Sequence, residues 1–323
     1  MNSSRLRWIC VGVTCTLLLA GCFGGKAPLL RAESQQRADT ALVRGVRAEQ
    51  KGNYQEAEKL LSEALTTSSS IEDYVGRTTA LINLARLHRL QHDLLKSESF
   101  IDQALALPTT DPRQTAEAAQ EKALLELAKG NPAQALEWAQ QALATEPGNL
   151  RGSRRNLTAR IQLLLGNRSA ADTLARAALP ENRSSGQAEE EANSLRIMGI
   201  IARHETKYSE SVLYLQEALV IDKRIGKSAK IALDLEELAA VAQQAGNLQT
   251  AADYLARAYD VNNAADRLQQ ALHNQVALAK IYEVLGNPLK AAMARDLVQK
   301  LAARSGVQQP PTSPETIKPS SKP

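Results

Sequence analysis

The sequence of 323 residues predicts an all-α protein, built as a row of about seven helix-turn-helix units. Three observations support this prediction. Ala and Leu are abundant, aromatic residues make up only 3% of the chain, and one short pattern recurs along most of its length. Because strands favour β-branched and aromatic residues, this composition argues against β-sandwiches and barrels. A row of small units also accounts for a length above that of a usual single domain.

Residues 1–21 are typical of a secretory signal peptide. Arg5 and Arg7 form a positive start, and the apolar stretch from Trp8 to Leu19 is too short to span a bilayer. It ends in Leu19-Ala20-Gly21-Cys22, which resembles the lipobox of bacterial lipoproteins. In that family the cysteine becomes the mature N-terminus and carries acyl chains such as palmitate, so the resemblance implies lipidation of Cys22. The alternative is an ordinary signal peptide that happens to precede a cysteine.

The residue after the lipobox bears on localisation. Phe23 stands where an Asp marks inner-membrane retention in well-studied Gram-negative lipoproteins. The resemblance therefore implies attachment to the outer membrane, facing the periplasm. Cys10 and Cys15 lie within the signal peptide, so we expect neither a disulfide nor a free thiol in the mature chain. Residues 22–37 are expected to be the lipidated cysteine and a tether.

The recurring pattern starts at a helix–helix turn. The turn has a short residue such as Gly, a bulky residue follows two positions later, a small residue three positions after that, and an Ala seven positions further. The clearest copy is Gly52-Asn53-Tyr54…Ala57…Ala64. Its seven copies have their turns at positions 52, 92, 130, 166, 206, 246 and 286. A unit of about 34 residues with a variable linker would give this spacing.

A second small residue precedes each turn by seven positions. These residues are Gly45, Ala85, Ala123, Ala159, Gly199, Ala239 and Ala279. Small side chains at fixed points allow antiparallel helices to approach closely, while Leu fills the remaining space. This packing explains the excess of Ala and Leu.

These residues resemble the tetratricopeptide repeat (TPR) family, over residues 38–305. The resemblance implies a right-handed α-solenoid. The family's first-helix Trp is absent, and its terminal Pro is clear only at Pro147. A generic Ala-rich helical bundle is the alternative. Arg295 and Val298 in the last copy suggest a cap with a more polar outer face.

Two segments interrupt or follow the repeats. Residues 180–190 are interpreted as the longest internal linker, which could hinge the first four repeats against the last three. Residues 306–323, rich in Pro and Ser, are expected to be a disordered tail.

Sequence motifs for catalysis and cofactors are lacking. The chain has no Gly-rich phosphate loop, HExxH or GxSxG, so we expect no enzyme, no catalytic residue and no cofactor. His88 and His92 lie four apart beside Asp93, as in part of a metal site. Both occupy packing or turn positions of their repeat, so no metal is expected. The net charge of +4 is too small to indicate a nucleic-acid partner.

In the TPR family, partners bind the concave face, which is lined by the first helix of each unit. Aligning the pattern places eight polar residues there: Asn83, Arg86, Arg89, Asn156, Arg160, Asn193, Arg196 and Arg203. Asn pairs with an extended backbone and Arg suits carboxylates, so we predict a groove for an acidic or C-terminal peptide segment. The alternative is solvated Arg on exposed helix faces. The family's carboxylate clamp is not carried over, because Leu42 and Val46 stand on the first helix.

The sequence therefore predicts a non-enzymatic, lipid-anchored scaffold or adaptor on the periplasmic face of the outer membrane. Its partner would be a protein or peptide, bound during the assembly of envelope machinery. Pilus or secretin, outer-membrane and cell-wall complexes are equally compatible with the sequence. Alternatives are a TPR subunit of an exopolysaccharide export system and, less favoured, a periplasmic enzyme.

Overall fold

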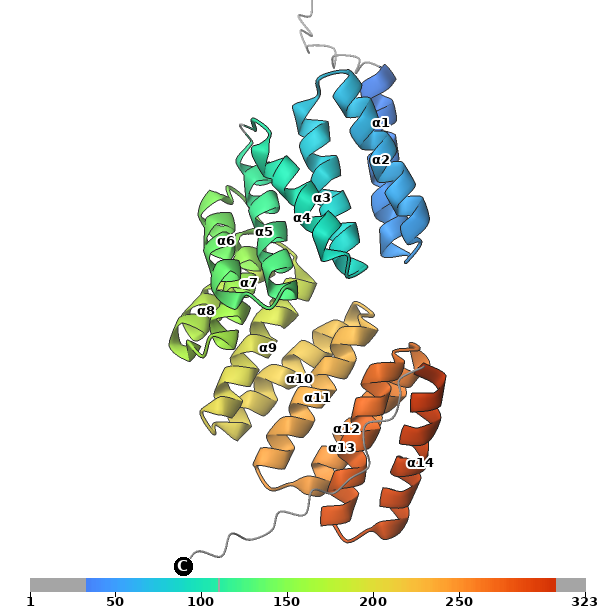
Figure 1. Ribbon diagram of the computed structural model, residues 1–323. Helices are drawn as coiled ribbons and strands as arrows, with labels where there is room; N and C mark the ends of the chain where they lie inside the picture. Colours follow the sequence, from blue (N-terminus) through green and yellow to red (C-terminus); the bar gives the residue numbers. More distant parts are fainter. Residues whose placement is uncertain (1–32, 110, 306–323) are drawn as a thin grey trace, which may run out of the picture.

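A computed structural model describes residues 33–109 and 111–305, and this part of the chain is a row of fourteen α-helices (Figure 1). The signal peptide, Cys22 and the tail lie outside the described residues, and the statements about them remain predictions. The first helix begins at Glu33, so residues 33–37 of the expected tether are already helical. None of the described helices has the length and apolar character needed to cross a membrane.

The helices form seven consecutive antiparallel pairs, each joined at one of the turns found in the sequence. They are α1 (Glu33–Gln50) and α2 (Tyr54–Ser70), α3 (Tyr74–Leu90) and α4 (Leu94–Ala106), α5 (Pro112–Ala128) and α6 (Pro132–Thr145), α7 (Arg151–Leu164) and α8 (Arg168–Ser184), α9 (Ala188–His204) and α10 (Tyr208–Arg224), α11 (Ser228–Gln244) and α12 (Leu248–Ala264), and α13 (Leu268–Val284) and α14 (Pro288–Ser305).

The pairs stack into an arc with an inner and an outer layer (Figure 1). The first helices of neighbouring pairs contact one another, as α1 does with α3, α3 with α5, α7 with α9, and α9 with α11. These first helices form the inner, concave layer, and the second helices lie outside them. The architecture is the predicted α-solenoid of seven helix-turn-helix units.

The turns share one backbone conformation, whether or not they contain glycine. Gly52 has φ 76°, and His92 and Thr206, which replace the turn glycine, have φ 62° and 60°. Glu72 and Asp266 adopt the same left-handed conformation between pairs, with φ 54° and 53°. Most helices are 17 residues long and most turns have three residues. The 40-residue interval therefore comes from long helices, and the expected 34-residue unit with a variable linker is wrong.

The interpretation of residues 180–190 as a linker is also wrong. Pro180 lies inside α8, and α9 begins at Ala188, so only a three-residue turn separates the helices. Asn182 is fully buried, and its Nδ2 donates to the Glu190 carbonyl at 3.3 Å and to Ser194 Oγ at 3.1 Å. These bonds fix the end of α8 to α9, so the polar composition of this segment reflects a buried joint between helices.

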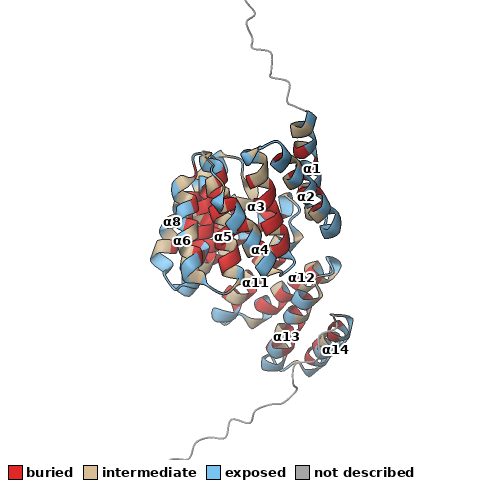
Figure 2. Ribbon diagram, turned by 45° about the horizontal axis from the view of Figure 1, so that its top comes forward, coloured by how far each residue is buried: buried red, intermediate tan, exposed pale blue. Residues whose placement is uncertain are grey.

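Small residues allow the two helices of a pair to approach closely, as predicted. A Cβ on Gly45 would lie 2.9 Å from Leu61 Cγ, and one on Gly199 would lie 2.7 Å from Leu215 Cγ. Ala57, five residues after the first turn glycine, is fully buried. Buried residues follow the contacting faces of the helices (Figure 2), as close packing of the interior requires.

The last pair has a mixed outer face, in which Arg295, Asp296 and Lys300 of α14 are exposed beside apolar side chains. Val284 on α13 is 73% exposed, and Leu289 and Met293 on α14 are 72% and 59% exposed. The pair buries Ala291, Ala294 and Leu301 against the array, but several apolar side chains remain in contact with solvent.

Candidate binding groove

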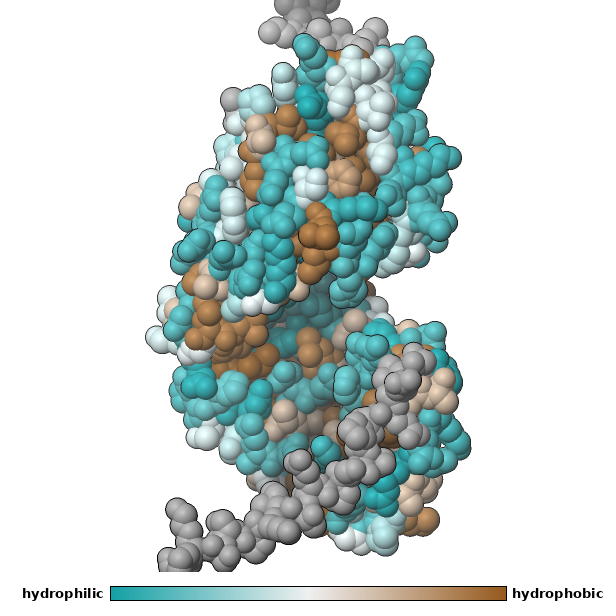
Figure 3. Space-filling view, viewed as in Figure 1, coloured by the Kyte–Doolittle hydropathy of each residue, from teal (hydrophilic) through white to brown (hydrophobic). Residues whose placement is uncertain are grey.

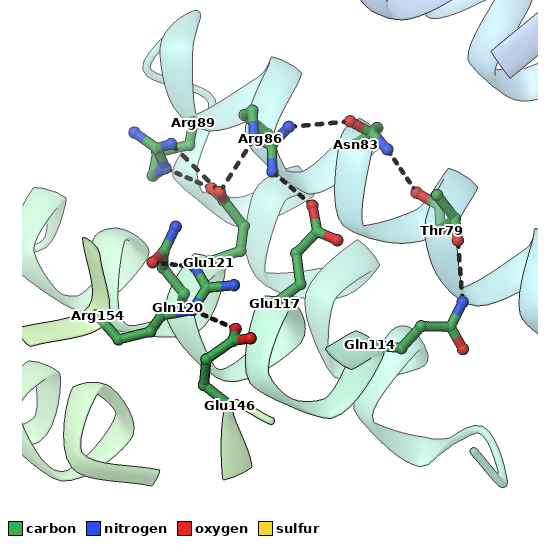
Figure 4. Close-up of polar contacts among 10 residues, drawn as sticks. All are labelled: Thr79, Asn83, Arg86, Arg89, Gln114, Glu117, Gln120, Glu121, Glu146 and Arg154. Carbon is green, nitrogen blue, oxygen red and sulfur yellow. Dashed lines mark hydrogen bonds and ion pairs between the residues drawn. The ribbon is translucent and has the colours of Figure 1, made fainter. Parts of the chain in front are cut away.

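The inner wall between α3 and α5 is a network of ion pairs across neighbouring repeats (Figure 4). Arg86 Nη2 lies 3.1 Å from Glu117 Oε1, and Arg86 Nε lies 3.5 Å from Glu121 Oε2. Arg89 Nε lies 2.5 Å from the other oxygen of Glu121. Glu121 is only 1% exposed, so its carboxylate is a buried partner shared by two guanidinium groups.

Asn83 belongs to the same network. Its Nδ2 donates to the Thr79 carbonyl at 2.8 Å, and its Oδ1 accepts from Arg86 Nη1 at 3.0 Å. Burial lowers the pKa of Arg86, but Glu121 and Glu117 outweigh burial and the net pKa is raised. Asn83, Arg86 and Arg89 thus connect α3 to α5, and their hydrogen-bonding groups are largely used within the protein.

Arg196 on α9 has a similar structural setting. Its side chain is 5% exposed and pairs with two fully buried carboxylates, Asp222 on α10 and Asp234 on α11. Its Nε lies 2.7 Å from Asp234 Oδ1. Burial raises the pKa of Asp234 to about 7, although Arg196 acts in the opposite direction. Burial likewise raises the pKa of Asp222. Burial therefore favours the protonated form of both carboxyl groups, although Arg196 favours the ionised form.

Arg203 and Asn156 are also engaged across repeats. Arg203 on α9 lies 3.2 Å from Glu237 on α11. Asn156 on α7 donates to the Glu190 carbonyl at 2.7 Å and to Glu190 Oε2 at 2.8 Å, and accepts from Ser194 Oγ at 2.8 Å. These contacts tie α7 to α9 and α9 to α11.

A cavity of about 270 Å³ opens between α5, α7, α9 and α11 on the concave side. The molecule is hollowed midway along the array, and hydrophobic residues lie beside the hollow (Figure 3). Four of the eight predicted groove residues line this cavity: Asn156, Arg160, Asn193 and Arg196. Its apolar wall consists of Leu124, Leu157, Leu163, Ile197, Ile200 and Leu233.

Arg160 differs from the other predicted arginines. It is exposed to the cavity, and within the described part of the chain its guanidinium makes no hydrogen bond and no ion pair. Burial in the groove lowers the pKa of Arg160, Glu190 opposes this effect, and the charge of Arg89 adds to it. The groove therefore contains an arginine without a direct acidic partner.

Lys230, near the start of α11, is a second such cation and was missed by sequence reasoning. Its Nζ donates to Asn193 Oδ1 at 3.2 Å, and among the described residues no carboxylate lies within ion-pair distance of it. Burial lowers the pKa of Lys230, and the charge of Arg196 lowers it further. Only its place on the inner helix, sixteen residues before the turn at Gly246, could have indicated it.

The two histidines considered for a metal site, His88 and His92, contribute to packing and to a turn. His88 is 1% exposed and stacks on Phe100, with ring centroids 5.3 Å apart. Burial lowers its pKa, which favours the neutral ring. His92 forms the left-handed turn between α3 and α4. Across residues 33–109 and 111–305, no group of three or more His, Cys, Asp or Glu side chains could hold a metal ion.

Comparisons with known proteins agree with this architecture. Residues 37–110 match the model of the tetratricopeptide repeat family. A Rap protein in complex with Competence and Sporulation Factor is similar in structure (15% identity, 83% of this chain and 77% of that chain, TM-score 0.64). So are NprR with its cognate peptide NprX (14%, 84% and 80%, 0.58) and pilF of Pseudomonas aeruginosa (16%, 76% and 99%, 0.54). No curated protein matches significantly.

Proposed function

We propose that this chain, a tetratricopeptide repeat solenoid, is a non-enzymatic scaffold that binds a protein partner in its concave groove. The observation that supports this most strongly is the cavity between α5, α7, α9 and α11, where Arg160 and Lys230 lack acidic partners beside an apolar wall. Cations without an acidic partner beside an apolar wall that is only partly buried form a surface that a complementary ligand would stabilise.

Repeat arrays use the concave surface that their curvature creates for binding extended partners. Two of the similar structures were solved with a bound factor or peptide, which indicates that this fold can present such a site. The cavity lies on the concave side and combines cations with an apolar wall, and such a surface suits part of a polypeptide that lies along the inner helices.

We further propose that the scaffold is held by lipid at Cys22 on the periplasmic face of the outer membrane and acts in the assembly of envelope machinery. Support comes from the Leu19-Ala20-Gly21-Cys22 sequence after a short apolar stretch, and from Phe23 in the following position. Several acyl chains on one residue anchor a protein stably, whereas a single chain binds reversibly.

The anchor is tested by the Cys22→Ser variant, expressed in the source organism. Wild-type protein should incorporate a clickable palmitate analogue and sediment with the membranes, whereas the variant should remain unlabelled and appear in the soluble fraction. An unlabelled wild-type protein would contradict the anchor, and so would a variant that sediments with the membranes to the same extent.

The groove is tested by placing a photo-crosslinking amino acid at one of two positions in the same cells. Ile200 lines the cavity, and Val220 on the outer helix α10 is 65% exposed and serves as the control. We expect a discrete protein adduct from position 200 that is absent from position 220. Equal adducts from both positions, or none from position 200, would contradict partner binding in the groove.

A further inference from the structure

We propose that the cavity receives the C-terminal residue of the partner, with its α-carboxylate on Arg160 and Lys230 and an aliphatic side chain against the apolar wall. This inference rests on the proposed function and makes it specific. It gives Arg160 and Lys230, which have no acidic partner among the described residues, the role of binding the carboxylate of the ligand.

The charges of the cavity lining favour a carboxylate. Arg160 has no ion pair within the described part of the chain, and Lys230 has only an amide oxygen as its partner. Glu190 is the one carboxylate among the lining residues, and it already accepts a hydrogen bond from Asn156 at 2.8 Å. A ligand carboxylate would supply the missing negative charge, and charge-assisted bonds to guanidinium and ammonium groups are the stronger kind.

The hydrogen-bonding inventory of the lining points the same way. The Oδ1 of Asn193 accepts from Arg196 and Lys230, and the Oε1 of Gln120 accepts from Arg154. The NH₂ groups of both amides make no hydrogen bond among the described residues. With Arg160 they form a surplus of donors, which suits a ligand end that consists of acceptor oxygens.

The size and apolar wall favour a terminal residue over an internal Asp or Glu. A C-terminal residue carries its carboxylate and its side chain on one Cα, so a single residue can satisfy the cations and fill the apolar wall together. An internal acidic residue would leave the wall to a second residue. The volume of about 270 Å³ lies just below the range of about 300–1,000 Å³ typical of small-molecule pockets, and suits one residue.

The experiment uses full-length protein, purified in detergent, and two libraries of hexapeptides tethered by their N-termini and randomised at the last four positions. One library ends in a free carboxylate and the other in an amide. We expect retained peptides in the free-acid library, enriched in Leu, Ile or Val at the last position. Amidation of these peptides should lower affinity about 10- to 100-fold, as for a lost charge-assisted bond.

Two variants connect this selectivity to the cavity. Arg160→Gln and Lys230→Gln should each weaken free-acid binding about 10-fold or more and reduce the preference for acid over amide. The control is Arg224→Gln, because Arg224 is exposed at the end of the outer helix α10 and should leave affinity unchanged. Helicity by circular dichroism verifies that each variant is folded.

The inference is overturned if free-acid peptides are retained no better than amides, or if Arg160→Gln binds as the wild type does. Enrichment of internal Asp or Glu, insensitive to amidation, would also overturn it and would assign the cations to side-chain carboxylates. In each case a crosslink from position 200 would still support partner binding in the groove, so the two proposals fail separately.

Discussion

The inner wall differs between its α3–α5 and α7–α9 sections, although both have an arginine at the same place in the repeat. Arg86 and Arg160 each lie six residues before the turn of their helix pair. On the next inner helix, Arg86 faces Glu117 and Glu121. The positions that correspond to these two acids in α9, thirteen and nine residues before the turn, are occupied by Asn193 and Ile197.

This difference shows that side chains on the neighbouring repeat determine whether an inner arginine forms ion pairs within the protein. Where the neighbour supplies two carboxylates, the arginine joins repeats and its charge is neutralised. Where the neighbour supplies an amide and an aliphatic side chain, the guanidinium donors of the arginine have no partner among the described residues, and a cavity opens beside it. One repeat position thus joins repeats in one section and, in our proposal, serves binding in the other.

The largest expected effect comes from breaking the α3–α5 network. Glu121→Ala removes a buried carboxylate shared by Arg86 and Arg89, and loss of one partner of a buried pair typically costs about 3–5 kcal/mol. We expect a loss of about 3 kcal/mol, the lower end, because both arginines retain some solvent contact. Urea denaturation followed by circular dichroism measures it. A loss similar to that of an exposed substitution would show that the network contributes little.

The next effect comes from making the α7–α9 section resemble the α3–α5 section. Asn193→Glu places a carboxylate at the position that Glu117 occupies in α5, opposite Arg160. The new carboxylate should compete with the ligand, so we expect about a 10-fold loss of affinity for free-acid peptides without loss of thermal stability. The matched control is Asn193→Gln. Unchanged affinity in the Glu variant would indicate that Arg160 does not receive the ligand.

The stability of the fold is expected to depend on pH through the buried cluster of Arg196, Asp222 and Asp234 beside the cavity. The folded protein holds a proton on Asp234 up to about pH 7, whereas an unfolded Asp releases it near pH 4. The folded state therefore binds more protons, and this contribution to stability declines as pH rises from about 4 to about 7. Asp234→Asn keeps an uncharged group there and should flatten the decline in melting temperature. A variant with the wild-type pH profile would contradict the raised pKa.

The smallest expected effect on stability is that of Arg160→Gln. Because Arg160 has no ion pair among the described residues and contacts solvent, its loss should change the free energy of unfolding by less than about 0.5 kcal/mol. Urea denaturation beside Glu121→Ala provides the comparison. A loss above 1 kcal/mol would mean that Arg160 supports the fold, as Arg86 does.

The sequence contained enough information for the fold and for part of the candidate site. All seven predicted turns join helix pairs, because the small residues that permit close packing recur at fixed spacing. The turns at Glu72 and Asp266 were not predicted, since neither residue signals a left-handed backbone. Because these turns were not predicted, the 40-residue interval was interpreted as short helices joined by linkers and not as long helices joined by three-residue turns.

The roles of the predicted groove residues could not be separated by sequence reasoning alone. Arg86, Arg160 and Arg196 share a residue type and an inner helix face, but only their contacts with the next repeat distinguish them. Arg196 is joined to Asp222, which comes from an outer helix and has no signature in the repeat pattern. The groove residues predicted from the sequence end with Arg203 on α9, whereas Lys230 lies on the next inner helix, α11.

The most direct test compares Arg160→Gln with Arg86→Gln in one calorimetric titration, with the tightest peptide from the free-acid library as ligand. We predict that Arg160→Gln loses at least about 10-fold in affinity, whereas folded Arg86→Gln binds as the wild type does. The opposite pattern, with binding lost in Arg86→Gln and retained in Arg160→Gln, would contradict the assignment of binding to the central cavity.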